Sequence, residues 1–344
     1  MVTTKVIVLT FDKGYHVGWR EPRKIVDHKT ILRALIYVAR LINAEKCIER
    51  FVRGELGASA LLPTIVLDNE VRLLAPFPRI PCLGKAARIR GLFVTLSTLK
   101  HVLDFIAKCV NAEGAPVAQE VVVGKVGNSE RVAIKCVDGL QMTLELERIR
   151  GVVCLGKECD EVKPHVPEEF FSIVSEYRNR IDRLSGAADV YEVYGVKPFT
   201  PLWLAFRGDK KAVDCCLNLL EVLQRLGIGG LRSRGWGKFK IGINMEVKSD
   251  DENVVTSFGG WSKGFNYLLG LALPGNWVDV EKSYATRDTV MGISGPPMDE
   301  YRLPLIYAMD VGSVVYAKDI PNPQILTINN GRAVIVFNPV VIHA

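Results

Sequence analysis

The stretch LGIGGLRSRGWGKFKI, residues 226–241, is the most distinctive part of this 344-residue sequence. Glycine and basic residues crowd it, and no Asp or Glu lies between Glu221 and Glu246. Glycine lets backbone N–H groups approach a ligand closely, and a basic cluster favours an anionic ligand. We therefore predict an anion-binding loop, whose candidate contact residues are Gly227, Gly229, Gly230, Arg232, Ser233, Arg234, Gly235, Trp236, Gly237 and Lys238.

The elements around this loop argue against a nucleotide site. Apolar residues at helical spacing predict a helix over 212–226, and partial alternation predicts a strand over 236–247. Phosphate-binding loops of nucleotide enzymes run in the other direction, from strand to helix. Arg232 also stands where both glycine-rich nucleotide motifs require glycine. The simpler alternative to a ligand is a glycine helix cap followed by a solvated turn.

The loop and three other stretches resemble one family. GIGGLRSRGWGKF resembles the C-terminal glycine-rich loop of the RAMP superfamily of CRISPR-associated RNA-binding proteins. The other matching stretches are YHVG at 15–18, KAARIR at 85–90 before the segment 93–105, and RNRIDR at 178–183 with the following Ser185-Gly186. Within the superfamily, the chain is most similar to the fourth Csm subunit, which caps the crRNA 5′ end in type III-A effector complexes.

This resemblance implies a function in antiviral defence. It implies a non-catalytic RNA-binding subunit that holds the repeat-derived 5′ tag of a crRNA and meets target RNA only indirectly. The implied protein partners are the large polymerase-palm subunit and a backbone RAMP subunit, and no cofactor is implied. Further RNA-binding candidates come from the N-terminal loop and from the RNRIDR segment: His16, Lys29, Arg178, Arg180 and Arg183.

The pattern of predicted elements indicates an α+β fold of two ferredoxin-like domains, similar to RNA-recognition motifs. The N-terminal domain covers 1–157 and includes a β-hairpin extension at about 118–153, whose turn signal is Asp138-Gly139. A plain sheet edge is the alternative for that extension. A charged, proline-bearing stretch marks the boundary, and the C-terminal domain, 158–344, carries the glycine-rich loop at 227–237.

Charge and cysteine usage narrow the class of protein. The net charge of +6 is mild, but a second basic block lies between Glu70 and Asp104 and either contacts RNA or forms a solvated face. The eight cysteines form no C-x-x-C pair, which favours reduced thiols and a cytoplasmic location. Cys154, Cys159 and His165 lack a fourth ligand, so we expect no metal site. No apolar run reaches membrane-spanning length, so we expect no membrane partner.

Catalysis is the alternative function. A metal-independent CRISPR repeat endoribonuclease of the RAMP fold needs a positioned base, and His16 and His28 are the candidates. In the related backbone subunits, an Asp in the loop before the first helix carries target cleavage. The corresponding segment of this chain is Asp27-His28-Lys29-Thr30. Lys29 stands where those subunits have the Asp, and Asp27 leaves this alignment open by one or two residues. The resemblance therefore favours a chain that is not an enzyme. The equivalent subunit of another type III complex is a third possibility.

Overall fold

The computed structural model describes most of the chain. The described residues are 1–18, 21–80, 82–83, 91–109, 119–126, 129–136, 142–181, 184–242, 245–291, 303–328 and 333–343.

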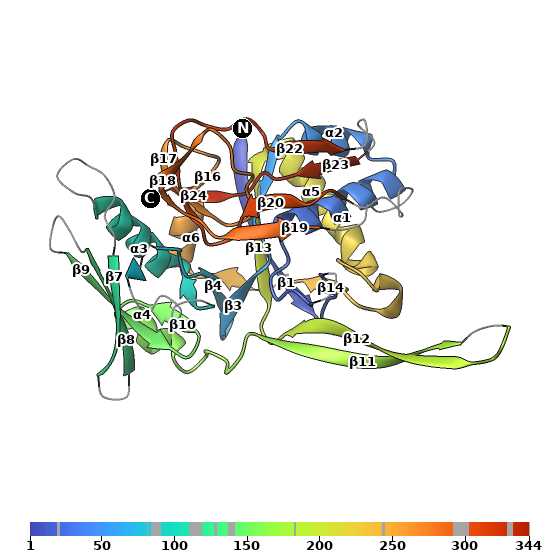
Figure 1. Cartoon of the computed structure of the whole chain (residues 1–344), viewed down its shortest axis with the longest axis horizontal. Helices are drawn as coiled ribbons and strands as arrows, with labels where there is room; N and C mark the ends of the chain where they lie inside the picture. The colour runs from blue at the N-terminus through green and yellow to red at the C-terminus, as the bar shows by residue number, and fades with distance from the viewer. Residues whose placement is uncertain are drawn as a thin grey trace.

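A large, mostly antiparallel sheet forms the centre of the molecule (Figure 1). Its strand order is β14-β1-β13-β3-β4-β6-β10-β9-β8-β7-β5, with β15 on β4 and β2 on β13. The strands of this sheet are β1 (Val2–Phe11), β2 (Leu56–Ala58), β3 (Leu62–Leu67), β4 (Glu70–Pro76), β5 (Cys82–Leu83), β6 (Phe93–Thr95), β7 (Gln119–Val126), β8 (Ser129–Cys136), β9 (Thr143–Ile149), β10 (Val152–Cys154), β13 (Leu202–Asp209), β14 (Phe239–Ile241) and β15 (Glu246–Val247).

Helix α5 packs on β1, β13 and β14, and helix α3 packs on β4 and β6, because each of the two buries an apolar stripe. In α5, for example, Ala212, Val213, Cys216, Leu219, Leu220 and Leu223 are buried. Helices α1, α2 and α5 pack against one another, and α3 packs against α6. The helices are α1 (His28–Leu41), α2 (Glu45–Val52), α3 (Leu96–Lys108), α4 (Lys157–Val162), α5 (Lys210–Leu226) and α6 (Ser249–Thr256), with a 3₁₀ turn η2 (Arg232–Arg234).

Smaller sheets surround this centre. Strands β11 (Phe171–Ile181) and β12 (Ala188–Pro198) form a long two-stranded ribbon that extends beyond the body of the molecule (Figure 1). A five-stranded sheet and two further ribbons follow along the chain. Their strands are β16 (Phe258–Gly259), β17 (Gly264–Leu268), β18 (Val278–Tyr284), β19 (Arg287–Val290), β20 (Ile306–Met309), β21 (Val314–Ala317), β22 (Ile325–Ile328), β23 (Ala333–Val336) and β24 (Val341–His343).

The mixed α+β class is confirmed, whereas the division into two ferredoxin-like domains stays a prediction. The halves 1–157 and 158–344 share the central sheet, since β13 pairs with β1 from Val2↔Asp209 to Leu9↔Leu202. Residue 157 therefore does not separate two independent sheets. Strands β7 to β9 form an antiparallel meander that joins this sheet through β10. The Asp138-Gly139 turn lies outside the described residues, and the hairpin extension stays a prediction.

The cysteines differ from the expectation of reduced thiols. Three disulfides join Cys47 to Cys215, Cys109 to Cys136 and Cys154 to Cys159. The first disulfide joins α2 to α5 across a sequence separation of 168 residues. No local sequence motif predicts this pairing. Among the described residues, no helix combines the length and the apolar character needed to cross a membrane.

Candidate nucleic-acid interface

The glycine-rich loop is held against the N-terminal loop by its own backbone. The amide of Gly237 donates to the carbonyl of Gly14 at 2.7 Å, and the amide of Gly230 donates to the carbonyl of His16 at 2.8 Å. A Cβ on Gly237 would lie 1.9 Å from the carbonyl oxygen of Ile228, so no larger residue fits there. Much of the glycine content therefore serves close backbone packing, and the role of these glycines in holding a ligand stays a prediction.

Several loop amides are already hydrogen-bonded within the chain. The N–H groups of Gly227, Ile228, Arg234 and Gly235 also donate to backbone carbonyls within the chain. A backbone donor that is already bonded gains little from a second acceptor. These bonded amides are therefore poor candidates for anion binding.

Stacking on aromatic rings holds the basic side chains of the loop. The guanidinium of Arg232 lies 4.8 Å from the ring centroid of Tyr37 on α1. The guanidinium of Arg234 lies 5.7 Å from the ring centroid of Tyr191 on β12. Ser233 between them is exposed, as are Arg234 and Lys238. The turn η2 therefore presents two arginines, each fixed by a tyrosine from a different element.

Lys13 adds a third cation to this edge. Its ammonium lies 5.0 Å from the ring centroid of Trp236, donates to the carbonyl of Arg234 at 3.3 Å and pairs with Glu176 at 2.6 Å. The hydrogen bond from Lys13 is the main cause that lowers the pKa of Glu176. Lys13 thus links the N-terminal loop, the glycine-rich loop and strand β11.

Trp236 is buried instead of lying on the ligand surface. Its side chain is 1% exposed and packs on Gly195, where a Cβ would lie 2.0 Å from the indole ring. Its indole nitrogen has no hydrogen-bond partner among the described residues. Trp236 therefore anchors the loop under the ribbon and cannot stack on a base. Phe239 is also buried, as we expected for a core residue.

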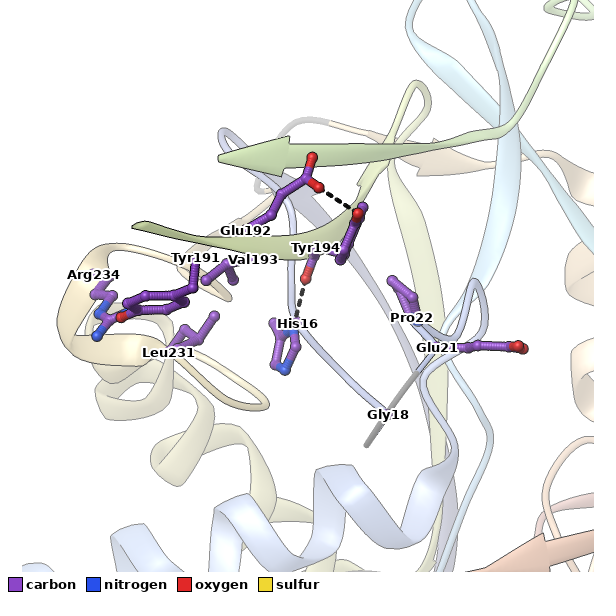
Figure 2. A pocket seen from close by; sticks show the side chains of 10 residues that line it. All are labelled: His16, Gly18, Glu21, Pro22, Tyr191, Glu192, Val193, Tyr194, Leu231 and Arg234. Carbon is purple, nitrogen blue, oxygen red and sulfur yellow. Dashed lines mark hydrogen bonds between the residues drawn. The ribbon is translucent and has the colours of Figure 1, made fainter. Parts of the chain in front are cut away.

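A cleft of about 490 Å³ opens between the loop and strand β12 (Figure 2). His16 lies on its wall, half-buried, and its Nδ1 is 2.5 Å from the backbone carbonyl oxygen of Tyr194. Because a carbonyl only accepts, Nδ1 carries the proton and a neutral ring keeps a lone pair on Nε2. The cleft is also lined by Glu21, Tyr191, Glu192, Leu231 and Arg234.

Lys29 is buried away from this cleft, contrary to its prediction as an RNA contact. It is 6% exposed, and its ammonium donates to Asp27 at 2.9 Å. Asp27 also caps α1 by accepting from the Thr30 amide at 2.8 Å. Burial alone would raise the pKa of Asp27, but the charge and hydrogen bond of Lys29 lower it to about 2. This buried pair is structural.

His28 is likewise enclosed. Its side chain is fully buried, and its Nδ1 accepts from the amide of Leu271 at 3.1 Å. Burial lowers the pKa of His28 to about 4. His28 therefore has no access to an RNA phosphate, and His16 is left as the histidine that faces a cleft.

The arginines of the RNRIDR segment lie on the ribbon. Arg178 pairs across strands with Tyr191, the residue on which Arg234 stacks, and it forms an ion pair with Glu176. Arg180 is exposed further along β11. Arg183 lies outside the described residues. The structure therefore brings Arg178 to the loop.

Arg72, the first cation of the second basic block, is not placed to contact RNA. Arg72 is 2% exposed and is surrounded by carboxylates, of which Glu161 is 2.8 Å and Asp251 3.7 Å away. Burial raises the pKa of Asp251 to about 7. Lys85, Arg88 and Arg90 lie outside the described residues.

Metal binding finds no support in the described ranges. They contain no group of three or more His, Cys, Asp or Glu side chains placed to hold an ion. Cys154 and Cys159, which we weighed as ligands with His165, are joined as a disulfide.

The sequence did not point to several residues that contact the glycine-rich loop or line the cleft. Tyr37 lies outside the apolar stripe of α1, and Tyr191 and Tyr194 alternate on a strand that we did not connect with the loop. Their only sequence signal is an aromatic residue at a solvent-facing position. Lys13 was visible only as one of many basic residues before α1.

Comparison with known proteins gives a match of fold. No protein-family model and no curated protein sequence matches this chain. A chain from the crystal structure of the Csm3–Csm4 subcomplex in the type III-A CRISPR-Cas interference complex matches with a TM-score of 0.57 at 15% identity, over 98% of this chain and 99% of that chain. A chain from the type III-B Cmr-beta complex bound to cognate target RNA and AMPPnP is more distant, with a TM-score of 0.44 at 9% identity, over 91% of this chain and 86% of that chain. The first match shows a shared fold over nearly the whole length of both chains.

Proposed function

We propose that this protein is a non-catalytic crRNA-binding subunit of a type III CRISPR effector complex. The observation that carries the proposal is the basic edge beside the cleft, formed by the exposed Arg234 and Lys238 and the half-buried Lys13 and Arg232. The shared fold with a chain of the Csm3–Csm4 subcomplex supports it. The RNA bound here would be the repeat-derived 5′ tag of a crRNA.

The geometry suggests how the RNA strand would be bound. Arginine and lysine side chains would neutralise phosphates, which gives affinity without regard to sequence. Because Arg232 and Arg234 are held by rings, they lose little side-chain freedom when they bind a phosphate. The RNA would be single-stranded, since the edge follows one short turn instead of the repeated grooves of a duplex.

The finer assignment is to a type III-A complex of the Csm type. The resemblance of the loop and of the RNRIDR segment favours it, and the Csm3–Csm4 structure is a two-subunit assembly from such a complex. The partners would be the large polymerase-palm subunit and a backbone RAMP subunit. The equivalent position in another type III complex would keep the RNA site and change the neighbours.

Co-purified RNA tests this proposal. The tagged chain would be isolated from cells that carry the CRISPR locus, and the bound RNA would be sequenced from its 5′ ends. We expect a uniform repeat-derived 5′ tag together with the large subunit. RNA without a shared 5′ end, or the absence of RNA, would contradict the proposal.

A repeat endoribonuclease is the second candidate, and the hydrogen bond of His16 favours it. With its proton on Nδ1, the ring has Nε2 available as a general base at the cleft. The test is incubation of repeat RNA with the purified chain in EDTA. Cleavage that His16→Ala abolishes, and that His101→Ala on the exposed side of α3 leaves intact, would establish the nuclease and overturn the non-catalytic assignment.

A further inference from the structure

The ring of His16 is held in one orientation by two different elements. Its Nδ1 donates to the carbonyl of Tyr194 on β12 at 2.5 Å, and the backbone carbonyl of His16 accepts from the amide of Gly230 at 2.8 Å. A Cβ on Gly230 would lie 2.9 Å from Cδ2 of the ring, so a larger residue there would push the ring from this position. His16 is therefore fixed in place before any ligand binds.

The other ring nitrogen of His16 is free to accept a hydrogen bond. Nε2 points away from β12 in Figure 2 and has no hydrogen-bond partner among the described residues. Because Nδ1 carries the proton, Nε2 of the neutral ring has a lone pair and no hydrogen. An ionised phosphate group also only accepts. The ligand atom that fits Nε2 is therefore a hydrogen-bond donor.

The charges along the cleft determine which part of a nucleotide faces this ring. Figure 2 shows Arg234 and Glu21 at opposite ends of the cleft, with His16 between them. Glu192 also lines the cleft, and the hydrogen bond from the Tyr194 hydroxyl lowers the pKa of this carboxyl, which keeps it ionised at neutral pH. Carboxylates repel phosphate. A phosphate therefore fits beside Arg234, and an uncharged part of the nucleotide fits beside His16.

A single RNA strand offers two kinds of hydrogen-bond donor. One is the 2′-hydroxyl of each ribose, and the other is the set of N–H groups on some of the bases. The 2′-hydroxyl lies next to the 3′-phosphate of its own nucleotide, whereas the base projects away from the backbone. A phosphate at Arg234 therefore brings a ribose toward the cleft, and the ribose hydroxyl is the donor that matches His16.

We propose that Nε2 of His16 accepts a hydrogen bond from the 2′-hydroxyl of the nucleotide whose phosphate Arg234 binds. This inference rests on the proposed function and adds a source of specificity to it. The contact selects RNA over DNA of the same sequence, because DNA lacks this hydroxyl. It requires no cleavage, since the ring accepts the hydrogen bond without removing the proton.

Single 2′ substitutions in the tag RNA test this inference. Fluorescence anisotropy would compare binding of the wild-type chain to the repeat-derived 5′-tag RNA and to a series in which one nucleotide at a time is 2′-fluoro. Fluorine removes the donor and keeps the sugar pucker of RNA, which a deoxyribose does not. Substitution at the nucleotide beside His16 should weaken binding about two- to twelvefold, the range for one net hydrogen bond.

The same series on variants separates a direct contact from a structural role. In His16→Ala, the nucleotide identified with the wild type should lose its sensitivity to 2′-fluoro. A ring that only holds β12 against the loop would weaken the binding of both RNAs equally when removed. Arg232→Ala is the matched control, because Arg232 stacks on Tyr37 and would bind a different phosphate. It should weaken the binding of both RNAs and leave their ratio unchanged.

Three results would overturn the inference and leave RNA binding in place. The first is a tag RNA in which no 2′-fluoro substitution weakens binding. The second is a sensitivity to 2′-fluoro that persists in His16→Ala. The third is a salt slope for His16→Ala that is smaller by about 0.7, which would show that a protonated ring binds a phosphate. A wild type that binds no tag RNA would instead contradict the proposed function itself.

Discussion

Two basic segments of this chain look alike in sequence and differ in the folded protein. Residues 27–29 follow a basic loop and contain a lysine, and residues 232–238 form the basic part of the glycine-rich loop. Lys29 is 6% exposed and paired with Asp27, whereas Arg234 is exposed and stacked on Tyr191. A basic residue in a sequence therefore does not by itself predict a surface for RNA, because a distant segment can cover it.

The cover over residues 27–29 comes from far along the chain. Gly270 passes so close to His28 that a Cβ there would lie 2.6 Å from Nδ1, and the amide of Leu271 donates to that nitrogen. By contrast, the glycine-rich loop is fixed from below by Trp236 and leaves its basic edge open. The first segment should therefore govern stability, and the second should govern RNA affinity.

The largest effect is expected from Lys29→Met. It would leave the Asp27 carboxylate buried without its partner, which costs about 3–5 kcal/mol. Guanidinium unfolding should show this loss, while the RNA affinity of the folded variant should match that of the wild type. Adding Asp27→Asn should recover part of the stability. A stable Lys29→Met variant with weakened RNA binding would reverse the roles of the two segments.

A pH-dependent effect is expected from His28. Its folded pKa is about 4 and its unfolded value about 6.5, so between these values the unfolded chain binds a proton that the folded chain excludes. The contribution of His28 to stability is therefore complete above pH 6.5 and falls by up to about 1.4 kcal/mol per pH unit as the pH drops toward 4.

The comparison with His28→Asn isolates this contribution. An asparagine oxygen can still accept from the Leu271 amide, and Asn does not titrate. Asp251, whose pKa is raised, makes the protein less stable as the pH rises, which is the opposite of the effect of His28. Both proteins contain Asp251, so its effect cancels in the difference between them. The gap in unfolding free energy between the wild type and the variant should change with pH below 6.5. A constant gap would show that His28 is not enclosed.

The smallest effect is expected from the rings that hold the arginines. Tyr37→Leu or Tyr191→Leu should each weaken RNA binding about two- to fivefold, since an exposed cation–π contact contributes roughly 0.5–1 kcal/mol. Tyr307→Leu is the matched control. The guanidinium of Arg287 lies 4.6 Å from the centroid of the Tyr307 ring, and neither residue belongs to the glycine-rich loop. Equal effects from all three substitutions would mean that the rings at the loop have no special role.

Local signals in the sequence were enough for part of this structure. The periodicity of 212–226 matches α5, and Phe239 is in the core as its strand pattern suggests. The pairing of β1 with β13 joins residues about 200 positions apart, which no local pattern specifies. The stretch FSIVSEYRNRI alternates like a strand, yet its arginines drew attention away from that pattern. The burial of Lys29 depends on a distant segment, so it required the structure.

The most direct test of RNA binding by the basic edge is a salt series on Arg232→Ala with Arg234→Ala. Binding of a single-stranded repeat-derived 5′-tag RNA would be measured by fluorescence anisotropy for the wild type and for the variant. Each lost phosphate contact should reduce the slope of log K against log salt by about 0.7. We predict a variant slope smaller by about 1.4, with unchanged thermal stability. Equal affinity and equal slopes would contradict the assignment of RNA binding to this loop.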